Sequence, residues 1–528
     1  MKKEAARFRP RLLQQNKNLD LIFLVLLAGF CSFYKLSVRN FWCDEAMNYL
    51  LSFNFSSELK FTYPPLYPTL LHFVTQFSQN EFFLRLSSAL FGIFSVIVFY
   101  FFAFRLAGRK VAMLSAVLLT LSPLRIWYSQ EASPHIMAFC LVLSAIYSFY
   151  LFTSEATVRN LFFWSLFNLL SFYTSNYSLL LLPAQALYLL LVRKELGGFF
   201  IKKYTQGLFI QLVLFLPQIH ILLDALSFIG KGFWIPGPSF NSLRYTVMNF
   251  LLGYNGTVLT YDLAFAIFCL VLILAFFSPV PKKILWLFIS FGVFPLLTIY
   301  AFHFFLRVYL DRNNLIFMPL FFLIISTVIL AIRTRIIRVA FLCLLVGLMI
   351  HSVINYFRDV MPLAGHQAYI SGVYIKKNVT NIIDQIKKEY SVNDILAVSS
   401  PGIVGPVYFY APKDMKIYYL FAEDDNYWTR GMNSYKPKNF PESKLLFVTT
   451  DWGKILFMDS LASQEAALEF LPSRVWLLQS SWSRSGCLED NAKSVEKTLK
   501  KRYVPVQKKW IEGVLVSLYI KNNALPVR

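Results

Sequence analysis

The sequence contains few charged residues for its length. Only 15% of its 528 residues are Asp, Glu, Lys or Arg, whereas 57% are hydrophobic. A soluble domain has about 25% charged and roughly 45–50% apolar residues. The surplus falls in apolar runs of about 17–25 residues, the length needed to cross a hydrocarbon core of roughly 30 Å. The composition therefore argues against one large water-soluble globule and predicts a polytopic membrane protein.

Acidic residues are especially scarce, because 29 Asp and Glu stand against 51 Lys and Arg and leave a net charge of +22. The placement of the basic residues does not suggest a nucleic-acid partner. They concentrate in short segments between apolar runs, such as Arg109–Lys110, Lys202–Lys203 and Lys282–Lys283, and alternate loops carry fewer of them. This alternation is the positive-inside pattern, and it predicts a cytoplasmic N-terminus in the cell (inner) membrane.

Cysteine motifs and a cleavable leader are also missing. The six cysteines form no CxxC pair and no metal-ligand spacing, so no cysteine-based metal or redox site is predicted. No small-residue cleavage site follows the first apolar run, which we therefore interpret as a retained helix.

The apolar runs predict about eleven transmembrane helices. They fall near residues 19–38, 82–104, 111–124, 135–153, 160–175, 178–192, 205–223, 262–280, 284–302, 314–332 and 339–357. An odd number of crossings from a cytoplasmic start places the C-terminus outside. Two long outer loops, at about 39–80 and 226–261, interrupt the spans. The first contains two amphipathic stretches, 45–55 and 66–77, which we expect to lie as helices in the membrane interface.

A different pattern begins near residue 359. Val379, Ile382, Ile383 and Ile386 recur at helical spacing. Short apolar runs bounded by Pro, Gly, Asp or Asn then follow, as is typical of strands, at 394–399, 416–421, 444–450, 474–479 and 514–520. A helical stretch near 491–502 precedes the last run. We therefore expect a transmembrane domain over 1–358 and an extracytoplasmic α/β domain over 359–528.

Two adjacent carboxylates, Asp44 and Glu45, follow the first predicted span. Carboxylates at a membrane surface are costly to bury without a task, so the pair suggests a catalytic base or a cation site. The pair equally fits solvated charges that cap the next helix. A third carboxylate, Glu131, is expected at the same depth beside Tyr128 and Gln130, where the third span reaches the outer face.

Prolines and basic residues complete the candidate set on the outer side. The prolines of Tyr63-Pro64-Pro65 fix the direction of the following helix, and this turn either forms one wall of a site or is purely structural. Arginine suits bidentate contact with a lipid phosphate, although each one alone is also typical of interfacial snorkelling. The basic side chains and histidines predicted on this side are Arg85, Lys231, Arg244, Arg307, Arg312, His135 and His303.

Several short motifs occur together in one order. They are Trp42-Cys43-Asp44-Glu45, Tyr63-Pro64-Pro65-Leu66, Leu84-Arg85-Leu86-Ser87-Ser88-Ala89-Leu90, Tyr128-Ser129-Gln130-Glu131-Ala132, Phe233-Trp234-Ile235-Pro236, and Arg312 seven residues before Pro319. With them the chain, over about residues 19–330, resembles the GT-C glycosyltransferases of the protein O-mannosyltransferase type (glycosyltransferase family 39). That group includes the bacterial enzymes that add aminoarabinose to lipid A.

The resemblance implies transfer of a hexose or pentose from a polyprenyl-phosphate donor to a hydroxyl of a lipid, glycan or protein. Asp44 would be the general base. Glu45 and Glu131 would hold Asp44, bind acceptor hydroxyls or share a divalent cation (Mg²⁺ or Mn²⁺) with it. No other cofactor is implied. The implied substrate-binding residues are Trp42, Tyr63, Pro64, Pro65, Arg85, Tyr128, Gln130, His135, Trp234, Arg244 and Arg312, with Arg85 and Arg312 beside the leaving phosphate.

The sequence departs from the family pattern at a few positions. Ser133 and His135 stand where members often carry Arg and Tyr, Asn313 stands where a Tyr is usual, and Tyr63 stands where some relatives have Lys or His. These changes concern the donor phosphate and the donor's identity more than the fold.

Two other functions remain open at this point. One is a GT-C-type polymerase or ligase of lipid-linked oligosaccharides, which would share this architecture and use a diphosphate donor. The other is a transporter or flippase, whose site would lie near mid-bilayer on broken helices in two related halves. Pro217 and Pro295 do interrupt spans, but no halves are evident and the candidate charges cluster at one surface. That clustering favours the enzyme.

Overall fold

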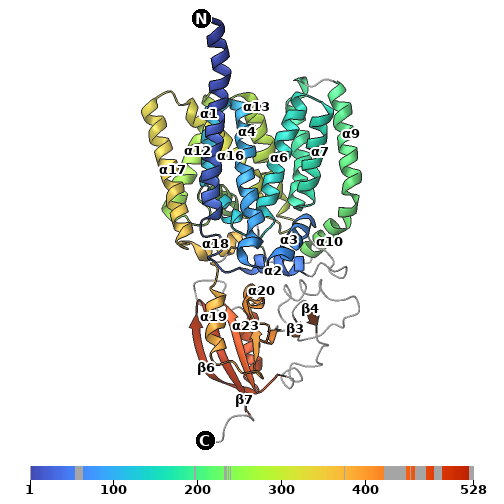
Figure 1. The fold of residues 1–528 in the computed structure, drawn as a ribbon, viewed down its shortest axis with the longest axis vertical. Helices are drawn as coiled ribbons and strands as arrows, with labels where there is room; N and C mark the ends of the chain where they lie inside the picture. Colours follow the sequence, from blue (N-terminus) through green and yellow to red (C-terminus); the bar gives the residue numbers. More distant parts are fainter. Residues whose placement is uncertain are drawn as a thin grey trace.

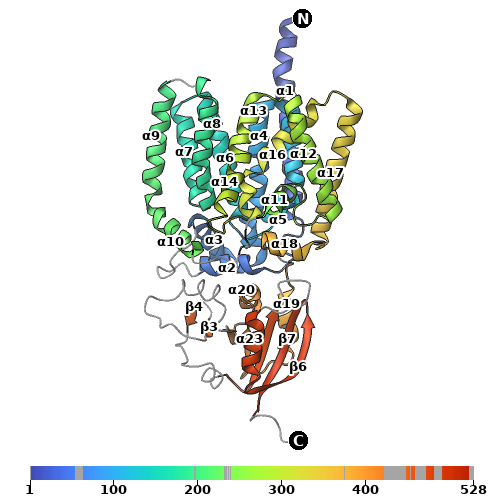
Figure 2. The same ribbon diagram turned by 180° about the vertical axis from the view of Figure 1, so that it is seen from behind.

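A computed structural model shows a helical bundle with a smaller sheet region at one end (Figure 1). It describes residues 2–53, 64–195, 198–230, 235, 237, 239–373, 375–420, 447–451, 454–457, 471–480 and 490–522. The described part of the chain begins at the end of the bundle away from the sheet and ends in the sheet region, as the reverse view in Figure 2 also shows.

The bundle is built from helices that run between its two ends and from short helices at one end. The longer set is α1 (Lys2–Phe33), α4 (Glu81–Leu121), α6 (His135–Ser154), α7 (Val158–Phe172), α8 (Leu181–Leu191), α9 (Gly198–Phe215), α12 (Val258–Phe277), α13 (Lys282–Phe288) with α14 (Phe294–Phe302), α16 (Pro319–Ala331) and α17 (Arg335–Phe357). The shorter set is α2 (Cys43–Phe53), α3 (Leu66–Phe77), α5 (Pro123–Ser129), α10 (Ile219–Gly230), α11 (Phe240–Leu252), α15 (Asp311–Asn314) and α18 (Ala364–Ser371). Helices α2, α3 and α18 lie at the end that faces the sheet (Figure 1).

The helices at the edge of the bundle expose apolar side chains, as a lipid-facing surface does. On α9, Phe209 is 69% exposed and Leu212 is 55% exposed. The buried α6, in contrast, packs nearly all of its apolar residues against its neighbours. The predicted membrane-spanning bundle is therefore confirmed.

The predicted count of eleven spans is not confirmed. Within the described residues, six helices are long and apolar enough to cross a membrane, or seven if the bent pair Asp311–Phe317 and Pro319–Ala331 is one span. The spans predicted near 82–104 and 111–124 correspond to two helices within Glu81–Leu121, which meet at a kink where Gly108 has a φ of 76°. Glycine adopts that conformation at little cost. The 15-residue α7 and the apolar segment Asn176–Leu191 are short for a full crossing.

The described residues of the C-terminal region form a seven-stranded sheet. Its strands are β1 (Ile395–Val398), β2 (Ile417–Leu420), β3 (Phe447–Asp451), β4 (Lys454–Phe457), β5 (Arg474–Ser480), β6 (Tyr503–Ile511) and β7 (Val514–Lys521), in the order β4-β3-β2-β1-β5-β7-β6. Strand β1 is parallel to β2 and β5, and the other pairings are antiparallel. One face packs against α19 (Val379–Lys387) and α20 (Pro401–Tyr410), and the other against α23 (Asp490–Leu499).

Candidate active site

Helix α2 begins at the end of the bundle that faces the sheet, and its first turn carries both Asp44 and Glu45. Acidic side chains are stabilised at a helix N-terminus, where backbone N–H groups are unpaired. Successive helical residues point about 100° apart, so the two carboxylates diverge. The Glu45 side chain is fully buried, whereas that of Asp44 is 37% exposed. The two residues therefore have different environments, although they are adjacent.

Glu45 is held by a buried arginine from α4. Arg85 Nε donates to Glu45 Oε1 at 2.7 Å, and Arg85 Nη2 donates to Oε2 at 2.9 Å. The Arg85 side chain is only 1% exposed. Its remaining donors are taken by backbone carbonyls of Leu36, Arg39 and Asn40. This bidentate pair fixes the start of α2 against α4 and the segment that follows α1, because each buried charge needs the other.

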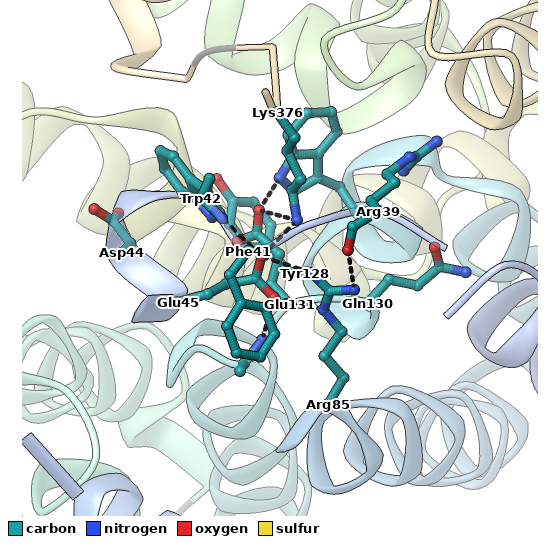
Figure 3. A network of polar contacts seen from close by, with 12 residues as sticks. Arg39, Phe41, Trp42, Asp44, Glu45, Arg85, Tyr128, Gln130, Glu131 and Lys376 are labelled. Atoms are coloured by element: carbon teal, nitrogen blue, oxygen red, sulfur yellow. Dashed lines mark hydrogen bonds and ion pairs between the residues drawn. The ribbon is translucent and has the colours of Figure 1, made fainter. Parts of the chain in front are cut away.

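A second cation reaches the same carboxylate from the C-terminal part of the chain. Lys376 Nζ lies 2.8 Å from Glu45 Oε2 and 3.5 Å from Glu131 Oε1. The indole N–H of Trp127, on α5, donates to Glu131 Oε1 at 2.5 Å. Figure 3 shows Lys376 between the two glutamates, while Asp44 points away from them.

The two glutamates differ in their proton affinity. Burial would raise the pKa of Glu45, but the charges of Arg85 and Lys376 outweigh it and lower that pKa to about 2. Burial raises the pKa of Glu131 to about 7, and the charge of Lys376 opposes that rise only in part. Glu131 lies between α5 and α6, outside the spanning helices. Glu45 is therefore a permanent anion, and Glu131 titrates near neutral pH.

This difference predicts a pH-dependent stability. The groups that face Glu131 are Lys376, Glu45 and Asp44, with the Trp127 indole. Because folding raises the pKa of Glu131, its contribution to stability is present at about pH 4.5 and is lost as the pH rises through about 7. Glu45 changes stability only at lower pH. We expect the melting temperature of the purified protein to fall between pH 5.5 and 8, roughly the window set by this pKa.

The matched variant is Glu131→Gln, which keeps an acceptor for Trp127 and removes the titration. Its melting temperature should fall several degrees less over the same pH window. Equal slopes for the variant and the parent would contradict the raised pKa of Glu131.

Asp44 forms a separate ion pair with an arginine from α15. Arg312 Nη1 donates to Asp44 Oδ2 at 2.7 Å, and the guanidinium lies 6.0 Å from the Trp42 ring centroid. The preceding Asp311 is buried and accepts hydrogen bonds from Asn249 at 2.6 Å and from Ser371 at 3.0 Å. Helix α15 is the first part of the bent helix pair. The hydrogen bonds of Asp311 therefore fix the backbone position of Arg312.

Other predicted site residues on α5 and α6 lie next to these charges. The Tyr128 hydroxyl is 2.7 Å from the Tyr254 hydroxyl, and its ring stacks edge-on against His135 at 5.0 Å. The Gln130 side chain links neighbouring helices. It donates to two carbonyls at the end of α1 and accepts from Tyr356 at 2.9 Å.

The proline turn borders an apolar groove. Pro64 is buried and Pro65 caps α3. The groove has a volume of about 470 Å³ and is lined by side chains from the turn, α3, α7 and α9, namely Pro65, Leu66, Thr69, Leu166, Leu169, Leu170, Tyr173 and Leu214. Its walls are almost wholly apolar, so it suits a hydrocarbon chain.

The remaining candidates are not in this cluster. Arg244, on α11, pairs with Asp262 of α12. Tyr63 and Trp234 lie outside the residues that the structure describes. The suggested metal pair of Asp44 and Glu131 gains no further ligand, since the described part of the chain contains no group of three or more His, Cys, Asp or Glu side chains suited to a metal ion.

Sequence reasoning missed Lys376 and Trp127. Trp127 directly precedes a recognised motif, but nothing in the sequence indicates that its indole contacts Glu131. Lys376 and Lys377 are adjacent lysines after the last span, on the side predicted to have few basic residues. That departure from the positive-inside alternation is the signal that was available.

Comparisons with known proteins bear on the family and the fold. Residues 62–221 match the family described as dolichyl-phosphate-mannose-protein mannosyltransferase. The crystal structure of ArnT from Cupriavidus metallidurans bound to undecaprenyl phosphate is similar with a TM-score of 0.62 at 13% identity, over 96% of this chain and 99% of that one. The apo state of ArnT gives a TM-score of 0.59 at 13% identity, over 96% and 98%. No curated protein matches the chain.

These findings identify the fold and a related family. The chain has the fold of ArnT, and the resemblance in its motifs is confirmed. The match to the dolichyl-phosphate-mannose-protein mannosyltransferases covers residues 62–221, less than half of the chain. The segment includes Arg85 and Glu131 but neither Asp44 nor Arg312.

Proposed function

We propose that the protein transfers a sugar from a polyprenyl phosphate to a hydroxyl acceptor at the outer face of the membrane. One observation carries this proposal. Asp44, the most exposed of the three clustered carboxylates, forms a 2.7 Å ion pair with Arg312 beside a buried cluster of Glu45, Arg85 and Lys376. A base and a phosphate-binding cation thus lie side by side at one end of the bundle.

The reaction then follows from these two side chains. Asp44 takes the proton of the acceptor hydroxyl as its oxygen bonds to the anomeric carbon. The bond from that carbon to the phosphate oxygen breaks with inversion, and polyprenyl phosphate leaves with the bonding electrons. Arg312 faces the negative charge that develops on the phosphate. A preorganised cation stabilises such a charge far more in a site that excludes water than in bulk water.

The buried pair has a supporting role in this proposal. Arg85 has its donors occupied by Glu45 and by backbone carbonyls, so we assign it to holding α2 and not to the phosphate. Trp42, Tyr128 and His135 lie close enough to Arg312 or to one another to bind the sugar. We keep Pro64 and Pro65 as the wall of the lipid groove, and Tyr63, Trp234, Arg244 and Gln130 as more peripheral contacts.

The proposal also includes a binding site for the polyprenyl chain and an orientation of the protein in the membrane. The apolar groove beside Pro65 would hold part of the polyprenyl chain, and ArnT is a protein of the same fold whose structure contains undecaprenyl phosphate. We place the N-terminus in the cytoplasm from the positive-inside pattern. The sheet end of the bundle then lies outside, with residues 1–358 as the transmembrane domain and 359–528 as the extracytoplasmic domain.

Mass spectrometry tests the proposed reaction. Purified full-length protein in lipid nanodiscs is incubated with polyprenyl-phosphate hexoses and pentoses and with hydroxyl acceptors. We expect free polyprenyl phosphate to accumulate together with an acceptor that is heavier by one sugar residue. An unchanged donor across the panel, with solute counterflow in liposomes instead, would support a transporter and reject the transferase.

A further inference from the structure

Lys376 belongs to the segment that joins the bundle to the sheet, between α18 and α19. That segment is anchored on both sides. The Thr380 N–H donates to Asn40 Oδ1 at 3.0 Å, close to the start of α2, and Lys377 Nζ donates to the Gly513 carbonyl at 3.3 Å in the β6–β7 hairpin. The position of Lys376 is therefore set by the docking of the sheet region on the bundle.

The charge of Lys376 balances the buried cluster. Without it, Glu45 would keep its ion pair with Arg85, and Glu131 would lose its ion pair with Lys376. Lys376 adds a second cation, 2.8 Å and 3.5 Å from the two glutamates, with its side chain only 9% exposed (Figure 3). Charge pairs interact strongly where water is excluded, so this contact is a substantial part of what orders the cluster.

The sheet region also contacts α2 directly through α20. A Cβ placed on Gly405 would lie only 3.0 Å from the Cβ of Ala46, so the two helices touch where the glycine leaves room. The Phe409 ring lies 4.6 Å from that of Phe41 and 5.0 Å from that of Tyr49. These contacts are on both sides of the acidic first turn of α2.

Tyr410 reinforces this contact. Its hydroxyl oxygen accepts from the Phe41 N–H at 2.7 Å and its proton is donated to Glu81 at the start of α4. Since Phe41 immediately precedes Trp42, α20 fixes the backbone that leads into Asp44.

We propose that the C-terminal sheet region is a positioning element of the active site, in which α20 orients α2 and Lys376 neutralises the glutamates beside Asp44. This inference rests on the proposed transferase function. Lys376 does not touch the reacting atoms. It holds Glu45 and Glu131 in place, so that Asp44 and Arg312 keep their geometry. Sugar transfer thereby depends on the docked state of the sheet region.

The test uses the full-length protein with Lys376→Met, Lys376→Arg and, as the matched control, Lys387→Met, which changes an exposed lysine of α19. Glu131 can take up a proton when the cation is lost, so we expect Lys376→Met to fold with a melting temperature close to that of the parent. Its kcat should fall about 100-fold while its KM for the donor changes less than roughly threefold, the pattern of lost transition-state positioning. Lys376→Arg should recover most of the loss, and Lys387→Met should behave as the parent.

A wild-type kcat for Lys376→Met would overturn the inference. If that variant gives no folded protein, Phe409→Ala tests the inference instead. It loosens α20 from α2 without changing a charge. Reduced kcat in Phe409→Ala supports the inference, and an unchanged kcat rejects it. Asp44→Asn, measured in parallel, separates the transferase function from the positioning role of Lys376. If Asp44→Asn is inactive while Lys376→Met is fully active, the transferase function stands and only the positioning role fails.

Discussion

Replacing Asp44 by Asn should abolish sugar transfer and leave the fold intact. The amide is nearly isosteric with the carboxylate, but it cannot accept the acceptor's proton and it removes the charge facing Arg312. General-base catalysis is worth about 10²–10⁴-fold, and the lost ion pair adds to that, so we expect a decrease of at least about 10³ in turnover. Release of polyprenyl phosphate by the purified variant, measured against time, gives the rate.

The matched control for this variant is Asp384→Asn. Asp384 is an exposed aspartate on α19, so the same chemical change should leave turnover and melting temperature at parent values. Turnover of Asp44→Asn at the parent rate would show that Asp44 is not the base.

Replacing Arg85 by Met should prevent accumulation of folded protein. Methionine has a similar length, but it leaves the fully buried Glu45 with Lys376 as its remaining cation and frees the carbonyls that Arg85 held. Removing one partner of a buried ion pair costs about 3–5 kcal/mol. We expect little monodisperse protein after size-exclusion chromatography in detergent, and a clearly lower melting temperature for what remains.

The double variant Arg85→Met with Glu45→Leu separates charge from packing. It removes both charges, and Lys376 still has Glu131 as a partner at 3.5 Å. Folded protein should return in large part, because an apolar pair of similar volume replaces the ion pair. A single Arg85→Met protein as stable as the parent would contradict the account of this pair.

The helices were predictable because a long apolar run has few alternatives in a membrane. The spans near 135–153 and 262–280 correspond closely to α6 (His135–Ser154) and α12 (Val258–Phe277). The number of crossings was less predictable, because composition does not show that the apolar runs near 160–175 and 178–192 form helices too short for a full crossing.

The sheet region was predicted less completely, for local reasons. Strand β6 was missed because Pro505 and the polar residues after it break the apolar pattern, which an edge strand with an irregular register tolerates. Helix α20 was missed because its prolines and glycines suggest a loop, yet Ile403 and Val407 bury it against the sheet.

The candidate site shows a similar division. Its acidic and basic residues other than Lys376 were found from their motifs, but their pairing was not, because Asp44 and Arg312 are 268 positions apart. The sequence also did not separate the roles of neighbouring carboxylates. Burial and partners do so, because the Glu45 side chain is fully buried beside Arg85, whereas that of Asp44 is 37% exposed beside Arg312.

The central claim is that a lipid-borne phosphate binds beside Asp44. An experimental structure of the full-length protein with polyprenyl phosphate tests it most directly. We expect the phosphate within hydrogen-bonding distance of the Arg312 guanidinium, with the first isoprene units leading toward the groove beside Pro65. A phosphate bound at mid-bilayer, or at the end of the bundle away from the sheet, would contradict the claim.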